Sequence, residues 1–135
     1  MKDVLFLIGS ESDRQAVQPG LDLLAEKEMS LDLKVLSAHR DLEQLLSFLK
    51  GEGANYRLVI AAAGLSAALP GVVASIVKSP VIGIPLVSGP LSGVDSLLSI
   101  LQLPKGVPVA TMGIGKQGVI NAVLLAERIL GRASR

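Results

Sequence analysis

Short apolar runs alternate with stretches of helical spacing along the whole chain. A loop with glycine, serine or proline follows each run, which is typical of strands buried on both faces of a parallel sheet. The pattern predicts five strands, at residues 4–8, 31–36, 58–62, 81–84 and 107–112. It predicts helices at about residues 14–28, 41–52, 72–77, 93–101 and 119–130. Because right-handed crossovers connect parallel strands, this alternation predicts an α/β fold with helices on both faces of the sheet.

Two of the predicted helices carry local signals of where they begin or break. Asp41 with Gln44 three residues later resembles a capping box, so we expect a helix to begin there. Its apolar positions predict one buried stripe, formed by Leu42, Leu45, Leu46 and Leu49. Pro19-Gly20 falls inside the first predicted helix, where we expect a kink or a restarted helix.

The composition favours one domain, residues 1–135, that assembles with copies of itself. A chain of 135 residues is long enough to bury a sizeable core. Half of the residues are hydrophobic but only 2% are aromatic, so leucine, valine, isoleucine and alanine must build that core. Charged residues make up only 19%, which is low for the fully wet surface of a small monomer. We therefore expect part of the surface to be buried in a homo-oligomer.

The same composition argues against several classes of function. A net charge of +1 with so few aromatic residues offers no platform for nucleic acid. The absence of cysteine removes thiolate metal sites, and a single histidine disfavours a histidine-based one. Residues 58–77 carry no charge, but Gly64, Ser66 and Pro70-Gly71 interrupt them, so a strand, turn and helix fit better than a membrane span. The first residues lack the features of a signal peptide, so we expect a cytoplasmic protein.

Candidate chemistry lies in the loops that follow the strands, because these loops all leave a parallel sheet at its carboxyl edge. Residues 37–40, Ser-Ala-His-Arg, contain the only histidine of the chain. His39 can titrate near neutrality and move a proton, although a loop histidine that only bonds backbone groups fits the same residues. Arg40 offers a fixed positive charge for a phosphate or carboxylate, although a solvated loop arginine is the commoner finding.

The loop after the first strand, residues 9–13, has the parts of an anion site. Its sequence Gly-Ser-Glu-Ser-Asp combines backbone N–H groups and two hydroxyls with the start of a helix. It lacks the lysine of a Walker loop and the glycine spacing of a dinucleotide fingerprint. The alternative is that Ser12 or Asp13 caps the first helix. Lys116 and Gln117, in a late loop before the last helix, have the same alternative as Arg40, because a solvated loop side chain is the commoner finding.

Together these motifs resemble one known family. In chain order they are Gly9-Ser10-x-Ser12-Asp13, Ser37-Ala38-His39-Arg40, Ala63-Gly64 with Leu69-Pro70-Gly71, Leu91-Ser92-Gly93-Val94-Asp95-Ser96-Leu97, and Pro104-x-Gly106-Val107-Pro108-Val109-Ala110. Over essentially its whole length the chain is similar to the small carboxylase/mutase of purine biosynthesis, which handles aminoimidazole ribonucleotides. The resemblance implies a flavodoxin-like three-layer α/β/α sandwich with a central parallel sheet of about five strands. It also implies a homo-octamer with sites between subunits, and no metal or organic cofactor.

The resemblance also implies a role for each matched residue. His39 would be the general acid and base of the mutase: it protonates the carbamate nitrogen of N5-carboxyaminoimidazole ribonucleotide, so that carbon dioxide leaves but stays trapped. Ring carbon C4 then attacks the carbon dioxide, and His39 removes the C4 proton. Arg40 with Ser10 and Ser12 would hold the 5′-phosphate, and Asp13 the ribose hydroxyls. The other substrate-binding residues implied by the resemblance are Ser37, Ala63, Gly64, Ser66 and Leu69.

One loop departs from the family pattern and leaves the carboxyl donor open. The mutase branch usually reads Ala-Ala-His-Leu-Pro-Gly where this chain reads Ser66-Ala67-Ala68-Leu69-Pro70-Gly71, so Ala68 replaces a second family histidine. The branch that carboxylates aminoimidazole ribonucleotide directly with carbon dioxide typically reads Ser-Asn-Ala-Leu, which this loop resembles. That branch usually has lysine after the loop histidine, however, and Arg40 follows the mutase.

Two further hypotheses stay open. A related carboxylase-like domain acts on a pyridine mononucleotide in making a nickel-pincer cofactor, and its Ala-Leu-Pro loop also lacks the second histidine. A paralogue that binds a ribonucleotide without turning it over would keep the binding loops as well, because a fold alone guarantees no activity. Under every hypothesis the chain binds a small-molecule nucleotide.

Overall fold

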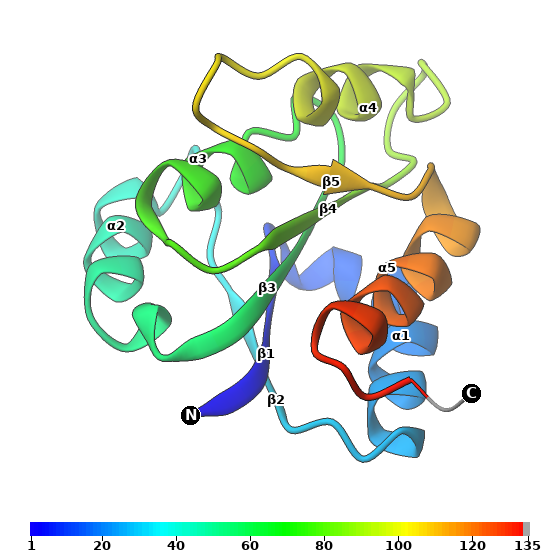
Figure 1. Cartoon of the computed structure of the whole chain (residues 1–135). Helices are drawn as coiled ribbons and strands as arrows, with labels where there is room; N and C mark the ends of the chain where they lie inside the picture. Colours follow the sequence, from blue (N-terminus) through cyan, green and yellow to red (C-terminus); the bar gives the residue numbers. More distant parts are fainter. Residues whose placement is uncertain (134–135) are drawn as a thin grey trace.

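A five-stranded parallel sheet forms the centre of the molecule (Figure 1). The computed structural model describes residues 1–133. The strands are β1 (Lys2–Ile8), β2 (Leu31–Val35), β3 (Tyr56–Ala63), β4 (Val81–Pro85) and β5 (Ala110–Thr111). Their order across the sheet is β2-β1-β3-β4-β5, and each neighbouring pair is parallel. The predicted α/β class and the five predicted strands are confirmed.

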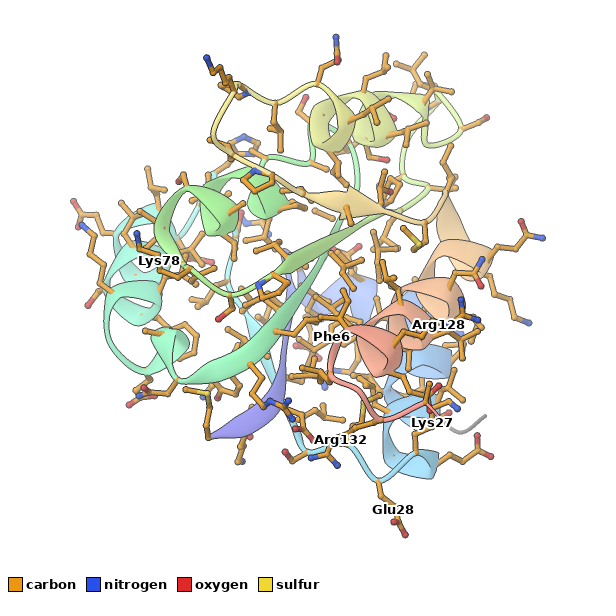
Figure 2. The ribbon with its side chains drawn as sticks, in the orientation of Figure 1. Phe6, Lys27, Glu28, Lys78, Arg128 and Arg132 are labelled. Atoms are coloured by element: carbon orange, nitrogen blue, oxygen red, sulfur yellow. The ribbon has the colours of Figure 1, made fainter. Side chains whose placement is uncertain are left out.

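Helices cover both faces of the sheet and give the molecule three layers (Figure 1). They are α1 (Arg14–Glu26), α2 (Leu42–Lys50), α3 (Leu69–Ile76), α4 (Val94–Leu101) and α5 (Gly115–Ile129), with two short 3-10 helices, η1 (Glu11–Asp13) and η2 (Glu52–Ala54). Successive residues of a strand point to opposite faces. Phe6 therefore packs in the core that β1 shares with α1 and α5 (Figure 2), whereas Leu5 and Leu7 pack in the core shared with α2 and α3.

β5 is shorter than the strand predicted at residues 107–112. Pro108 has no backbone N–H to donate to a neighbouring strand. The Val107 N–H donates to the Pro104 carbonyl oxygen at 3.1 Å, which closes a turn in place of a strand pair. Pairing with β4 is therefore confined to Ala110 and Thr111.

Pro19-Gly20 does not restart the first helix, because α1 continues through it. Proline removes one helical hydrogen bond, but α1 is buried on both sides of it, at Val17 and at Leu24. A Cβ on Gly20 would lie 2.7 Å from Cγ1 of Val119 on α5. Glycine at this position lets α1 and α5 approach closely, and this packing holds the helix together across the proline. The expected restarted helix is wrong.

α2 begins at Leu42, and the predicted capping box is absent. Asp41 precedes the helix, but its side chain accepts no hydrogen bond from the first helical N–H groups. It accepts the backbone N–H of Ser37 instead, at 3.0 Å. The predicted leucine stripe is confirmed at Leu45 and Leu49, which are buried, whereas Leu42 is 43% exposed. The stripe therefore begins one turn later than its spacing predicted.

α3 and α5 both begin earlier than predicted, at Leu69 and Gly115. The first N–H groups of a helix have no partner within the helix, so proline, glycine and polar residues without helical spacing fit there. Pro70 occupies this turn in α3. Lys116 and Gln117, which we expected in a loop, occupy it in α5.

The uncharged residues 58–77 fold as the interrupted pattern predicted. They form most of β3, a loop and α3. Within residues 1–133 there is no helix with both the length and the apolar character that a membrane span requires.

Candidate active site

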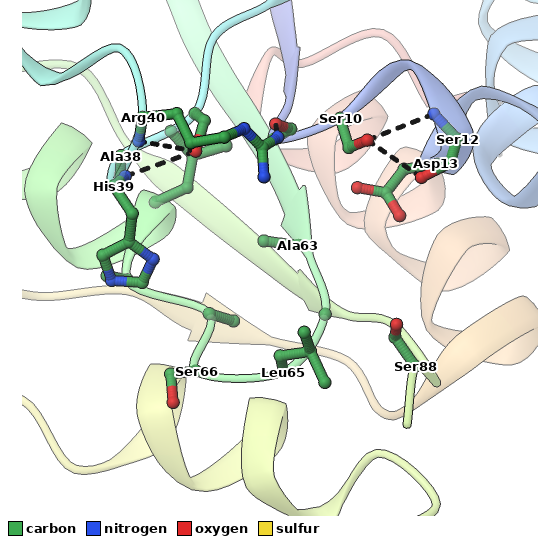
Figure 3. A pocket seen from close by; sticks show the side chains of 16 residues that line it. Ser10, Ser12, Asp13, Ala38, His39, Arg40, Ala63, Leu65, Ser66 and Ser88 are labelled. Carbon is green, nitrogen blue, oxygen red and sulfur yellow. Dashed lines mark hydrogen bonds between the residues drawn. The ribbon is translucent and has the colours of Figure 1, made fainter. Parts of the chain in front are cut away.

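A cavity of about 450 Å³ opens at the carboxyl edge of the sheet, where the loops after β1, β2 and β3 meet (Figure 3). β1 leads to α1 on one face of the sheet, whereas β3 leads to α3 on the other face. The two connections diverge at this point and leave a crevice, which is where open α/β sheets bind ligands. The volume suits a small molecule.

Every site residue implied by the family resemblance lines this cavity. They are Ser10, Ser12, Asp13, Ser37, His39, Arg40, Ala63, Gly64, Ser66 and Leu69. The strand order brings them together, because β1 lies between β2 and β3. Their individual roles stay predictions. Lys116 and Gln117 lie elsewhere, at the start of α5.

The prediction missed part of the lining. The additional residues are Gly9, Ala38, Leu65, Ala67, Ala68 and Ser88. Most of them adjoin predicted residues in the same loops, and membership of those loops was the available signal. Ser88 comes from the loop after β4, and its only signal was that this loop also leaves the carboxyl edge. The loop passes so close to β3 that a Cβ on Gly64 would lie 2.7 Å from the Cβ of Ser88.

Residues 37–41, the histidine turn, form a closed loop of hydrogen bonds between β2 and α2. The buried hydroxyl oxygen of Ser37 accepts the backbone N–H of His39 at 3.3 Å and that of Arg40 at 3.1 Å. The Ser37 N–H donates to Oδ2 of Asp41 at 3.0 Å, and the Asp41 N–H donates to the Ser37 carbonyl oxygen at 2.9 Å. These hydrogen bonds hold the backbone of His39 and Arg40 in place beside the cavity (Figure 3).

The two side chains leave the histidine turn in different directions. The guanidinium of Arg40 extends toward Ser10, and its Nη2 donates to the Gly9 carbonyl oxygen at 2.9 Å (Figure 3). The His39 ring points in a different direction from this guanidinium (Figure 3). No hydrogen bond among the described residues engages the ring nitrogens, so they are free to bond a ligand. The alternative of a histidine that bonds only backbone groups does not match this geometry.

The first loop and Arg40 together form the polar end of the cavity. The hydroxyls of Ser10 and Ser12 lie 2.9 Å apart, and the Ser10 oxygen also accepts the Ser12 N–H at 3.3 Å. Ser10 thus caps η1, whereas Asp13 makes no side-chain cap on α1, so the capping alternative for Ser12 and Asp13 is wrong. A fixed cation beside two hydroxyls at the start of a helical segment suits a phosphate.

Asp13 is half-buried beside this polar end. Burial raises the pKa of the Asp13 carboxyl above its usual value, although a backbone hydrogen bond from Ser10 and the charge of Arg40 act in the opposite direction. Its oxygens lie in the lining of the cavity, where they can accept hydrogen bonds from ligand hydroxyls.

The wall opposite the polar end is made of small and apolar residues. Ala63, Leu65, Ala67 and Ala68 line it, with the hydroxyls of Ser66 and Ser88 as its polar groups. Ala68, where the family resemblance implied a second histidine in the mutase branch, also lines the cavity and packs against the core shared with α2 and α3. Among residues 1–133 no group of three or more histidine, cysteine, aspartate or glutamate side chains is placed to hold a metal ion. The arrangement fits an anionic group at one end and a neutral ring, within reach of one imidazole, at the other.

Comparison with known proteins identifies the family. The family model described as AIR carboxylase matches residues 3–135. The chain belongs to the AIR carboxylase family. It is 44% identical over 129 residues to the N5-carboxyaminoimidazole ribonucleotide mutase of Brucella melitensis biotype 1. The aligned residues make up 95% of this chain and 80% of that protein. It is 46% identical over 126 residues to the mutase of the same name from Pseudomonas aeruginosa, with 93% and 77% covered.

A solved structure agrees with this membership. The crystal structure of Treponema denticola PurE superposes with a TM-score of 0.85 at 32% identity, and covers 97% of this chain and 81% of that chain. The AIR carboxylase chain described here therefore has the flavodoxin-like fold that the resemblance implied, with the strand order β2-β1-β3-β4-β5.

Proposed function

We propose that this chain interconverts N5-carboxyaminoimidazole ribonucleotide and 4-carboxyaminoimidazole ribonucleotide, which is a step of purine biosynthesis. The observation that carries the proposal is the meeting of His39, Arg40, Ser10 and Ser12 in one cavity at the carboxyl edge of the sheet. Relatives that are 44% and 46% identical carry the name of this mutase. The cavity matches the substrate in kind, because a ribonucleotide has a phosphate at one end and a small ring at the other.

Proton transfer in this reaction falls to His39. The protonated imidazole gives its proton to the carbamate nitrogen N5, the bond from N5 to the carboxyl carbon breaks, and carbon dioxide is released into the cavity. Carbon C4 of the ring then forms a bond to carbon dioxide. The neutral imidazole takes the proton from C4, which restores the aromatic ring and the starting state of His39. One histidine serves both steps because imidazole is a competent acid and base near neutral pH.

The rest of the lining holds the substrate and the carbon dioxide. Arg40 with the hydroxyls of Ser10 and Ser12 binds the 5′-phosphate, and Asp13 binds the ribose hydroxyls. Ser37, Ser66 and the backbone at Ala63-Gly64, together with Leu69, surround the ring and its carboxylate. An apolar wall excludes water, so that carbon dioxide is kept close to C4.

Direct carboxylation of aminoimidazole ribonucleotide by carbon dioxide is the second candidate. The observation that favours it is Ala68, which lines the cavity at a position where the mutase branch usually has histidine. Both candidates use His39 at C4 and need no cofactor, and they differ only in where the carboxyl carbon comes from.

A direct assay separates these candidates. Purified protein is incubated with N5-carboxyaminoimidazole ribonucleotide and, separately, with aminoimidazole ribonucleotide, bicarbonate and carbonic anhydrase. Turnover of the first alone supports the mutase, and turnover of the second alone supports direct carboxylation. Failure of both contradicts the proposal and favours a binding-only paralogue or a protein acting on a pyridine mononucleotide.

The functional unit in this proposal is a homo-oligomer, an octamer by the family resemblance, in the cytoplasm. The support comes from α4, which lies at the margin of the molecule with its outer side uncovered (Figure 1). Val94, Leu98 and Leu101 on that side are 50%, 52% and 55% exposed. Large apolar side chains gathered on one exposed side of a helix are typical of a surface that another protein covers, and a second copy of the chain is the occupant that we propose.

A further inference from the structure

We propose that Asp41 is a positioning residue of this site: its carboxylate closes the histidine turn and thereby sets the directions of His39 and Arg40 together. Asp41 is not among the site residues that the family resemblance implied. The proposal rests on the proposed function for its kinetic test only, because the closure of the turn can be measured without substrate.

Asp41 and Ser37 bond to each other in both directions. Oδ2 of Asp41 accepts the Ser37 N–H at 3.0 Å, and the Asp41 N–H donates to the Ser37 carbonyl oxygen at 2.9 Å. A pair of bonds between the same two residues restricts their relative rotation more than one bond does. The Asp41 carbonyl oxygen also accepts the Leu45 N–H at 2.9 Å. The closed turn is therefore tied to the first turn of α2.

Ser37 connects the Asp41 carboxylate to the backbone of His39 and Arg40. Its hydroxyl oxygen accepts the backbone N–H groups of His39 and Arg40, at 3.3 and 3.1 Å. Ser37 is only 6% exposed, and Ala38 is 9% exposed and belongs to the core shared with α2 and α3. A displacement of Ser37 would consequently shift the imidazole and the guanidinium at the same time.

The Asp41 carboxylate has no competing task in the described part of the chain. It caps no helical N–H, joins none of the ion pairs among residues 1–133 and does not line the 450 Å³ cavity. Its bond to the Ser37 N–H is charge-assisted, which makes it stronger than a bond to a neutral acceptor. Among residues 1–133 the one hydrogen bond of this half-buried carboxylate is the bond from the Ser37 N–H, and Asp41 also lines a second pocket of about 300 Å³ beside His39 and Arg40.

Three variants test the proposal. Asp41→Ala removes the acceptor, Asp41→Asn keeps an acceptor oxygen without the charge, and Glu43→Ala removes a neighbouring carboxylate that faces solvent in the same helix start. We expect Asp41→Ala to lower kcat and to raise KM, each by about three- to tenfold, because it disturbs the imidazole and the guanidinium together. Asp41→Asn should restore most of both losses, and Glu43→Ala should behave as the unmodified protein.

Amide hydrogen exchange gives a second readout that needs no turnover. In Asp41→Ala the amide protons of Ser37, His39 and Arg40 should exchange about tenfold faster or more, while those in the middle of α2 keep their rates. A purely structural role would accelerate exchange throughout α2 and leave kcat and KM unchanged after correction for the unfolded fraction.

The outcomes separate this inference from the proposed function. Unchanged exchange at Ser37, His39 and Arg40 in Asp41→Ala overturns the positioning role, whether or not the protein turns over either substrate. Faster exchange with unchanged kcat and KM in an active protein overturns it as well. If the unmodified protein is inactive on both substrates, the proposed function fails, and the exchange data alone decide whether Asp41 closes the turn.

Discussion

At the scale of single residues, the proposed function separates anion binding from proton transfer. In that proposal Arg40 and the two serines of the first loop donate to a phosphate, whereas His39 contributes the only imidazole of the chain. The two functions sit on adjacent residues but point in different directions (Figure 3). A substitution can therefore remove either side chain without the other, and the two substitutions should change different kinetic constants.

Replacing His39 by Asn should abolish turnover, with a loss of at least about a hundredfold in kcat, because general acid and base catalysis at both steps depends on the imidazole. Binding of the ribonucleotide should persist, since the phosphate contacts are made elsewhere. Steady-state kinetics and calorimetric titration with aminoimidazole ribonucleotide measure the two quantities. A variant that retained most of its rate would contradict the mechanism.

Replacing Arg40 by Ala should chiefly raise KM, by about tenfold or more, because a bond to a phosphate stabilises the ground and transition states alike. Arg14→Ala is the matched control, since Arg14 carries the same charge at the start of α1 but pairs with the exposed Glu11. Its KM should not change. An unchanged KM in Arg40→Ala would remove that residue from the site.

At the scale of elements, Asp3 connects four parts of the fold at the edge of the sheet opposite the cavity. Asp3 in β1 accepts the N–H of Ser30, which precedes β2, at 3.1 Å. Its Oδ1 lies 3.2 Å from Arg57 of β3 and 3.1 Å from Arg132, which follows α5 (Figure 2). Burial by itself would raise the pKa of Asp3, but the hydrogen bonds from Ser30 and Arg57 and the charges of Arg132 and Arg57 outweigh it, so the pKa is lowered.

Asp3→Asn should destabilise the fold by about 2 kcal/mol at pH 7, because it leaves two arginines around a buried position without their anion. A lowered folded-state pKa contributes stability that is present above the unfolded value of about 3.9 and is lost as the pH falls through the folded value. The difference in the free energy of unfolding between the unmodified protein and Asp3→Asn should therefore shrink below about pH 4. Urea unfolding at several pH values measures it, and a difference independent of pH would contradict this account.

The elements also show why strands were predicted better than helix starts. A buried strand is a continuous apolar run, which is a local property of the sequence. The starts of α3 and α5 hold proline, glycine and polar residues, because the first turn needs no helical pattern. The continuity of α1 across Pro19 depends on its contact with Val119, which lies far away along the chain.

At the scale of the whole molecule, the exposed side of α4 is the surface on which the proposed assembly rests. Leu98→Lys places a charge in the middle of that side and should lower the mass measured by light scattering. Ile129→Lys is the matched control, because Ile129 is also exposed, at 44%, but lies on α5. An unchanged mass for Leu98→Lys would show that α4 is not part of the interface.

The sequence alone determined the alternation of strands and helices, the family, and most of the residues that line the cavity, because apolar runs, loop composition and motifs are local signals. Only the tertiary structure decided that these loops meet, since their meeting follows from the strand order β2-β1-β3-β4-β5. It also decided which partner each polar group takes. Local spacing assigned Asp41 to a helix cap, whereas the fold brings the Ser37 N–H within 3.0 Å of its carboxylate. A polar side chain bonds the nearest unpaired group in space, and that group is known only when the chain is folded.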